Sequence, residues 1–273
     1  MIRRLWIGLA VLLIAAPAGF MSAPAGLEAA ELLSHRAIYR MSLDRATGGS
    51  EVVAAEGMML YRFAEACDGW TVENRTYLRL RYERGSDTET VWTFVSWEAA
   101  DGLSFRFNAR YEQDGNVVEK LKGEANLDGS EGAGSARFSL PDDTEVDLPE
   151  GAMFPTEHML NLIAAAEADE KILNAVVFDG SSLDNPYRVG AIMAPLSAAD
   201  TEALAKAAEL PEKPAWWVRM AFFPYRGEGS LPEFELGARY RDDGVADEIT
   251  QHFENFSLVL RLKEFEVLEK PDC

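Results

Sequence analysis

The chain has 273 residues, is 48% hydrophobic and carries a formal net charge of −20 at pH 7. This length and apolar content are enough for a large buried core. A protein this acidic is repelled by phosphate backbones and by bare anionic lipid surfaces, so nucleic acid is excluded as a partner.

The first residues have the anatomy of a secretory signal peptide. Arg3 and Arg4 form a short basic start, an apolar run covers 5–16, and small residues follow. The run is too short for a comfortable membrane span, and the alternative is an uncleaved anchor. We therefore expect 1–25 to be removed, with cleavage somewhere between 18 and 30. The mature chain is predicted to be exported and to have no transmembrane segment.

Alternating apolar and polar residues predict a series of strands in the first half of the chain. The expected strands cover 35–43, 51–63, 71–82, 90–97, 103–111 and 117–127, with turns at Gly48-Gly49 and Asp114-Gly115. The segment 90–97 is apolar on both sides, which predicts a strand buried on both faces. The glycine-containing segment 128–135 is expected to be a flexible loop.

Two helices interrupt the strands of the second half. Thr156 is expected to cap a helix over 156–168, whose apolar stripe includes Leu162 and Ile163. A short alanine-rich helix is expected over 200–208. Further strands are expected over 171–178, 187–193, 215–223, 232–240, 245–253 and 256–265.

Some twelve to fourteen strands in one flat sheet would expose its edges and half of its apolar faces. The predicted fold is therefore mainly β, with a large curled antiparallel sheet (a β-spiral or an open barrel). A central helix would plug or cap an opening, and a short second helix would lie in an insertion. No linker or repeat divides 30–273, so we expect a single domain. A sheet of this size can enclose an elongated apolar interior.

Cys67 and Cys273 are the only cysteines in the chain. In an exported protein the favoured interpretation is one disulfide, and the alternative is two buried free thiols. A bridge would pull the end of the chain back onto an early strand and close nearly the whole fold. We interpret the pair as structural, because catalytic redox pairs usually have close Cys-x-x-Cys spacing.

Patterns typical of nucleophilic catalysis and zinc binding are weak. There is no Gly-x-Ser-x-Gly motif, and His35, His158 and His252 lack zinc-ligand spacing. His158 has the best functional case, because it lies in the first turn of the expected central helix. A structural histidine that hydrogen-bonds a nearby loop is nevertheless favoured over a catalytic one. His35 and His252 fit the polar faces or the ends of strands.

Carboxylates are numerous, so close pairs arise by chance. Asp143, Glu145 and Asp147 share one face of a short strand, where an exposed acidic edge is favoured over a calcium site. Glycosidase chemistry needs two carboxylates at a fixed separation, which a sequence cannot reveal. We therefore predict no catalytic residue, no cofactor and no metal site.

Trp216 and Trp217 are the most informative aromatic residues. Adjacent strand residues face opposite sides, so one of them should point outward or into a covering element. An exposed tryptophan would indicate a partner surface. The aromatic residues as a group could instead line a pocket for acyl chains, although filling a wide curled sheet is the favoured interpretation.

Five landmarks occur in order along the chain. They are His35-Arg36-Ala37-x-Tyr39, Cys67-Asp68-Gly69-Trp70, Phe154-Pro155-Thr156-Glu157-His158, Phe178-Asp179-Gly180-Ser181 and the final Cys273. Together they resemble the alphaproteobacterial cell envelope integrity protein B family, long described as a domain of unknown function. The resemblance covers essentially the whole mature chain.

The resemblance implies a periplasmic protein folded as a long β-spiral and held by a disulfide that matches Cys67 and Cys273. Members are needed for envelope integrity under stress, have no assigned enzymatic activity, and have a periplasmic tetratricopeptide-repeat protein as a functional associate. The shape is also similar to that of periplasmic lipoprotein and lipid carriers, which is an analogy of fold alone.

Three functional hypotheses follow, in order of preference. The first is a non-enzymatic periplasmic protein that maintains the cell envelope through protein–protein contacts. The second is a carrier or binder of a lipid or another apolar envelope component, which a solid, side-chain-filled interior would contradict. The third is a hydrolase of envelope polymers that uses carboxylates as acid and base.

Overall fold

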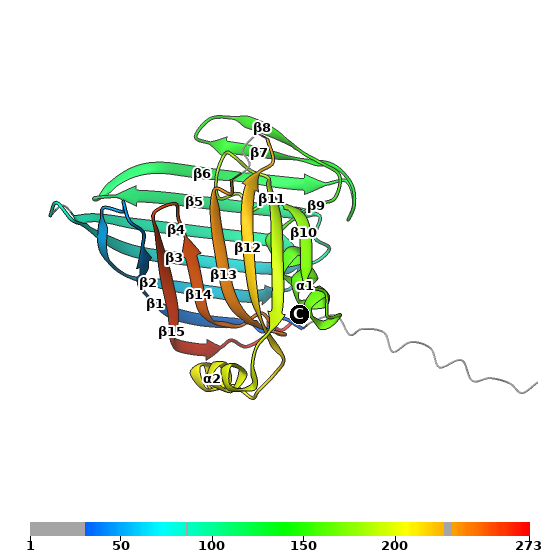
Figure 1. Cartoon of the computed structure of the whole chain (residues 1–273). Helices are drawn as coiled ribbons and strands as arrows, with labels where there is room; N and C mark the ends of the chain where they lie inside the picture. Colours follow the sequence, from blue (N-terminus) through cyan, green and yellow to red (C-terminus); the bar gives the residue numbers. More distant parts are fainter. Residues whose placement is uncertain (1–30, 86, 227–230) are drawn as a thin grey trace, which may run out of the picture.

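The computed structural model describes residues 31–85, 87–226 and 231–273 (Figure 1). The expected signal peptide and its cleavage region lie outside the described residues. In the described part of the chain, no helix is long and apolar enough to cross a membrane.

Fifteen strands and two helices make up the described chain. The first eight strands are β1 (His35–Ala46), β2 (Val52–Ala66), β3 (Gly69–Tyr82), β4 (Asp87–Ala99), β5 (Ser104–Gln113), β6 (Asn116–Leu127), β7 (Gly134–Leu140) and β8 (Thr144–Leu148). The remaining elements are β9 (Ala152–Met153), α1 (Pro155–Glu167), β10 (Ile172–Val177), β11 (Tyr187–Pro195), α2 (Ala198–Ala208), β12 (Ala215–Pro224), β13 (Phe234–Arg241), β14 (Ala246–His252) and β15 (Phe256–Val267).

All fifteen strands belong to one sheet, in the order β8-β7-β6-β5-β4-β3-β2-β1-β15-β14-β13-β12-β11-β10-β9. Strands β9 and β10 are parallel, whereas the other neighbouring pairs are antiparallel. Strand β1 pairs with β15 in the middle of the sheet. The two edge strands, β8 and β9, are joined by 149–151 alone, so the curled sheet is nearly closed.

The sheet curls so that its two halves face each other (Figure 1). Strands β1–β6 run across the rear of the view, and β10–β13 run down the front at a steep angle to them. Helix α1 lies beside β10 at one open side, and α2 lies outside the sheet near its lower end. The predicted mainly β fold, with a curled antiparallel sheet and two helices, is confirmed.

Four clusters of buried side chains make up the core. The first gathers phenylalanines of β5 and β7 with Phe154 and Phe178. The second joins β1, β2, β3 and β15. The third packs Leu162, Ala165 and Ala166 of α1 against β10–β13. Ile163 on the same helix belongs to the fourth, with Leu32 and with Phe63 of the opposite half. Helix α1 therefore lies between the two halves of the sheet.

The prediction that 90–97 is buried on both faces is wrong. In β4, Trp92 and Phe94 pack on the interior, but Val95 on the other face is 45% exposed. The outward Trp97 is half-buried because the guanidinium of Arg106 lies 4.9 Å from its ring centroid. The outward apolar residues Val91, Val95 and Trp97 stay partly exposed, so they do not form a second buried layer.

Gly180 provides a test of the packing that links the two halves. Its φ is +67°, and a Cβ at this position would lie 2.4 Å from Cγ of Phe107. We expect Gly180→Ala to lower the free energy of unfolding by about 2–3 kcal/mol, through backbone strain and overpacking together. Urea denaturation measures the change.

Gly115→Ala is the matched control, because Gly115 has a φ of +79° but a Cβ added there would have nothing within 4 Å. This variant carries backbone strain without the clash, so its free energy of unfolding should fall by about 1–2 kcal/mol. If the free energy of unfolding fell equally in both variants, the clash with Phe107 would not contribute to the loss of stability in Gly180→Ala.

Candidate functional site

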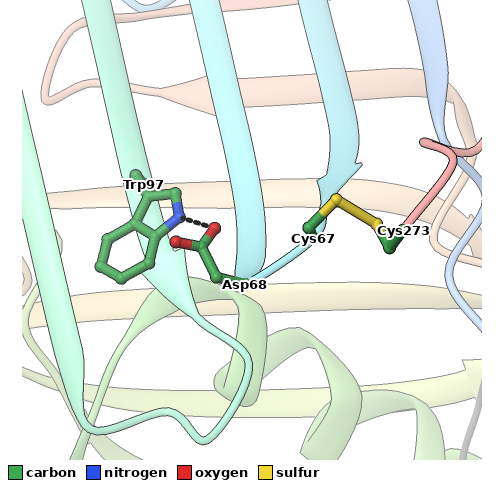
Figure 2. The surroundings of a disulfide bond; sticks show 4 residues. All are labelled: Cys67, Asp68, Trp97 and Cys273. Carbon is green, nitrogen blue, oxygen red and sulfur yellow. Dashed lines mark hydrogen bonds between the residues drawn. A yellow bond between two sulfur atoms is a disulfide. The ribbon is translucent and has the colours of Figure 1, made fainter.

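Cys67 and Cys273 form the predicted disulfide, with their Cα atoms 5.6 Å apart (Figure 2). Cys67 lies in the turn between β2 and β3, and Cys273 lies in the segment after β15. Lys270 in this segment also forms ion pairs with Glu31 and Glu65. The bridge therefore fixes the segment after the last strand to the turn after the second strand.

The residues that follow Cys67 fasten the same turn to β4. The Asp68 carboxylate accepts a hydrogen bond of 3.1 Å from Nε1 of Trp97 (Figure 2). Gly69 faces the backbone of Glu98 so closely that a Cβ would lie 2.0 Å from that carbonyl oxygen. The Trp70 ring stacks on Phe63, with ring centroids 5.0 Å apart. This motif thus holds the turn between β2 and β3 against β4.

The start of α1 is capped by a residue that the sequence analysis did not single out. Glu98 on β4 accepts backbone hydrogen bonds of 2.7 Å from Thr156 and 3.0 Å from Glu157. The expected cap at Thr156 is wrong, because Phe154 is the N-cap residue and Thr156 already lies inside the helix. Pro155 at the first helical position explains the earlier start, since it has no N–H to satisfy.

Glu98 is a buried acid, with 4% of its surface exposed. Burial raises its pKa to about 7, although the two backbone hydrogen bonds from α1 favour the ionised form and oppose the shift. The partly buried Glu157 beside it has a raised pKa for the same reason. The helix N-terminus therefore contacts a carboxyl group that titrates near neutral pH.

His158 is 6% exposed and lies one turn into α1. Burial lowers its pKa to about 4, so the imidazole is neutral at pH 7. Its Nε2 atom has no hydrogen-bond partner among the described residues. The expected bond to a nearby loop is therefore not made by this nitrogen, and an unpaired buried polar atom costs about 1–3 kcal/mol.

Two adjoining cavities lie next to α1 inside the curled sheet. The first, of about 210 Å³, is lined by His158 and other residues of α1 together with residues of β2, β3, β10, β12 and β13. The second, of about 180 Å³, extends between β1, β2, β3, β13 and β14 and is lined in part by His35. Both are bounded by Tyr61, Met159, Leu236 and Tyr240. The interior is therefore not completely filled by side chains.

Tyr61 and Tyr240 lie at the junction of the two cavities. Burial raises the pKa of both phenols, and their mutual proximity contributes to the shift of Tyr61. The lining residues include one carboxylate, Asp179, and no lysine or arginine. This interior disfavours negative charge.

The two tryptophans of β12 point in opposite directions. Trp216 is 9% exposed and packs in the α1 cluster, whereas Trp217 is 37% exposed on the outer side of the sheet. Two isoleucines paired across β10 and β11 lie on the same outer face, Ile172 at 61% and Ile192 at 56% exposure. Ile172, Ile192 and Trp217 are called the outer apolar face below.

A shallow groove of about 600 Å³ adjoins the outer apolar face at Gly190 and is lined in part by Asn174, Arg188 and Phe223. Arg188 and Arg219 are exposed on this side of β11 and β12, and neither forms an ion pair within the described residues. An apolar surface with unpaired positive charge is unusual on a chain with a net charge of −20.

The acidic residues near β8 lie at an edge of the sheet, as the sequence analysis favoured. Asp143 accepts hydrogen bonds of 2.7 and 2.8 Å from Arg137, and Asp147 lies 3.9 Å from Arg226. Across the described ranges, no group of three or more histidine, cysteine or acidic residues is arranged to hold a metal ion.

The sequence matches the model of the family described as EipB-like over residues 27–269. The chain belongs to the EipB-like family. A relative of this EipB-like chain, the cell envelope integrity protein EipB of Brucella abortus (strain 2308), is 28% identical over 255 residues, which cover 92% of this chain and 90% of the relative.

A solved structure also resembles this EipB-like chain. It is the crystal structure of a β-barrel-like protein of a domain of unknown function from Brucella abortus, with a TM-score of 0.79 and 27% identity. The match covers 88% of this chain and 100% of that one. The family resemblance inferred from the five landmarks is thus confirmed.

Two landmarks of this EipB-like chain meet at one end of α1. Phe154 and Phe178 pack edge to face with ring centroids 6.4 Å apart, and the backbone N–H of Phe178 donates to the carbonyl of Met153.

The sequence pattern did not single out Glu98, although it contained a signal. Glu98 shares the inward parity of Trp92 and Phe94 on β4. A lone acid among inward-facing residues indicates a buried partner.

Proposed function

We propose that this EipB-like protein helps to maintain the cell envelope by binding another envelope protein in the periplasm, without enzymatic activity. The name of the Brucella relative supports the envelope role. The proposal includes export by residues 1–25, a single mature domain over 30–273, and a partner from the tetratricopeptide-repeat class that the family resemblance implies.

The outer apolar face is the observation that carries this proposal. Its three side chains are exposed apolar groups on adjacent strands, and clustered surfaces of this kind are typical of binding sites. The neighbouring strand edge is also open: within the described chain, β9 pairs only with Val176 and Val177 of β10. Residues 172–175 therefore present backbone groups that another strand can pair with.

These features favour one kind of occupant, an extended segment of the partner protein. Such a segment would add a strand beside β10 and place alternate side chains over Ile172 and toward the groove at Gly190. The exposed guanidinium groups of Arg188 and Arg219 favour a segment that carries carboxylates.

The Ile192→Asp variant tests this surface. It should fail to restore detergent resistance to a strain that lacks the protein, because a carboxylate is placed in the centre of the outer apolar face. A photo-crosslinking residue at position 192 should capture the same protein in every preparation, and the crosslink should disappear when Arg188 and Arg219 are replaced by Glu.

The matched control is Val118→Asp on β6, because Val118 is also an exposed β-branched strand residue at 60% exposure. This variant should restore resistance fully. Melting temperatures and periplasmic levels of both variants verify that folding is intact. Full complementation by Ile192→Asp would refute binding at this face.

A further inference from the structure

The space beside α1 has the dimensions of a small-molecule site. The two adjoining volumes, about 210 and 180 Å³, together reach the range of ~300–1,000 Å³ that small ligands occupy. Since a water molecule takes up ~30 Å³, they offer room for about a dozen groups of that size. The space is elongated, because the two volumes adjoin at Tyr61, Met159, Leu236 and Tyr240.

The walls of this space are mainly apolar and aromatic. Phe63 and Phe222 face the first volume from opposite halves of the sheet, and Leu162 and Met159 close it on the side of α1. Ile249 and Met59 continue the apolar wall into the second volume. A hydrocarbon chain placed along this axis would gain buried contacts over most of its length.

His158 provides a polar group in this apolar wall. Its side chain lines the first volume, is more than nine-tenths buried, and has an Nε2 atom without a hydrogen-bond partner in the described protein. Buried polar atoms are almost always hydrogen-bonded, so an unpaired one that lines a cavity indicates a missing partner. That partner is expected to be part of whatever occupies the cavity.

The charges around the space select against an anion. Asp179 lines the first volume, and no lysine or arginine lines either one. A carboxylate or phosphate here would be desolvated, would have no cation to pair with, and would be repelled by Asp179. A hydroxyl carries no charge, and the cost of its desolvation is offset when it donates to or accepts from an imidazole nitrogen.

We propose that the space beside α1 binds a neutral molecule with a hydrocarbon chain and a terminal hydroxyl, which hydrogen-bonds Nε2 of His158. The chain extends past Tyr61 and Tyr240 toward the second volume, between β1 and β14. This binding activity is independent of the contact surface on the outside of β10–β12.

Three ten-carbon probes separate the parts of this proposal in calorimetric titrations of the mature protein. Decanol should bind, decane should bind about three- to ten-fold more weakly because it lacks the hydrogen bond, and decanoate should bind most weakly because it is charged. Decanol should also shift the imidazole nitrogen resonance of His158 in NMR spectra. If no probe binds, the cavities hold only water and the proposal is wrong.

His158→Phe should remove the preference for decanol over decane while leaving decane binding in place. The matched control is His252→Phe, because Nε2 of His252 also lacks a partner but His252 lines neither cavity. Leu236→Trp, which fills the shared wall, should abolish binding of all three probes and covers the case in which His158→Phe does not fold. If His158→Phe still preferred decanol to decane, the hydroxyl would be bound by a group other than His158 and the proposal would be wrong.

Discussion

Breaking the Cys67–Cys273 disulfide is expected to lower the melting temperature of the protein by as much as about 10–20 °C. The bridge joins residues 206 positions apart, and closing a loop of this length can stabilise the folded state by up to about 5 kcal/mol. For a protein of this size, each kcal/mol corresponds to about 2–4 °C. Thermal unfolding of the Cys67→Ser variant, followed by circular dichroism, measures the effect.

Several matched variants identify the bridge itself as the cause. Cys273→Ser and the double variant should melt at the same temperature as Cys67→Ser, and a reducing agent should lower the melting temperature of the unmodified protein alone. A melting temperature that does not respond to reduction would mean that ion pairs such as Lys270–Glu31 suffice to hold the final segment.

The Glu98→Gln variant is expected to gain stability relative to the unmodified protein by about 2–3 kcal/mol between pH 5 and pH 8. The folded-state pKa of Glu98 is about 7, above its ordinary value of 4.5. The folded protein therefore holds this proton more tightly than the unfolded chain does. Its stabilising effect is complete at low pH and is lost as the pH rises from 4.5 through 7.

Urea denaturation of both proteins at pH 5 and pH 8 tests this expectation. The substitution also alters the cap of α1, so the absolute stability of Glu98→Gln will differ from that of the parent at every pH. The titration of the buried acid is therefore measured by how the stability difference between Glu98→Gln and the parent changes with pH. Glu83→Gln, at an exposed position in the β3–β4 turn, should show no such change. Parallel pH profiles for Glu98→Gln and its parent would mean that Glu98 does not titrate near neutrality.

Most strands could be predicted because one side of each faces the interior and the other faces water. Along β12, Trp216, Val218 and Met220 are buried and the residues between them are more exposed, so a two-residue period gives both the strand and the opposite orientation of Trp217. The same rule was misleading for β4, where two outward valines and Trp97 gave the pattern of a doubly buried strand.

The interior could be predicted only in outline. The contact between Glu98 and Thr156 spans 58 positions, and no local pattern determines which strand residue lies over a helix N-terminus. The cavities beside α1 depend on how far Tyr61, Leu236 and Tyr240 extend from their strands. Periodicity gives the side of a strand on which a residue lies, but not how completely opposing side chains fill the space between them.

The order of strands in the sheet also constrains how the chain folds. Every pair of neighbouring strands is consecutive in sequence except β1 and β15. Each arm can therefore grow mainly by successive hairpins, apart from the parallel β9–β10 pair, whereas the β1–β15 pairing must close a very long loop and is expected to form late. Cys67 follows β2 and Cys273 follows β15, so the two thiols meet only after this closure. Formation of this disulfide during folding thus reports that the sheet has been completed. If Cys67 reacted earlier, it would form a bond to a different molecule.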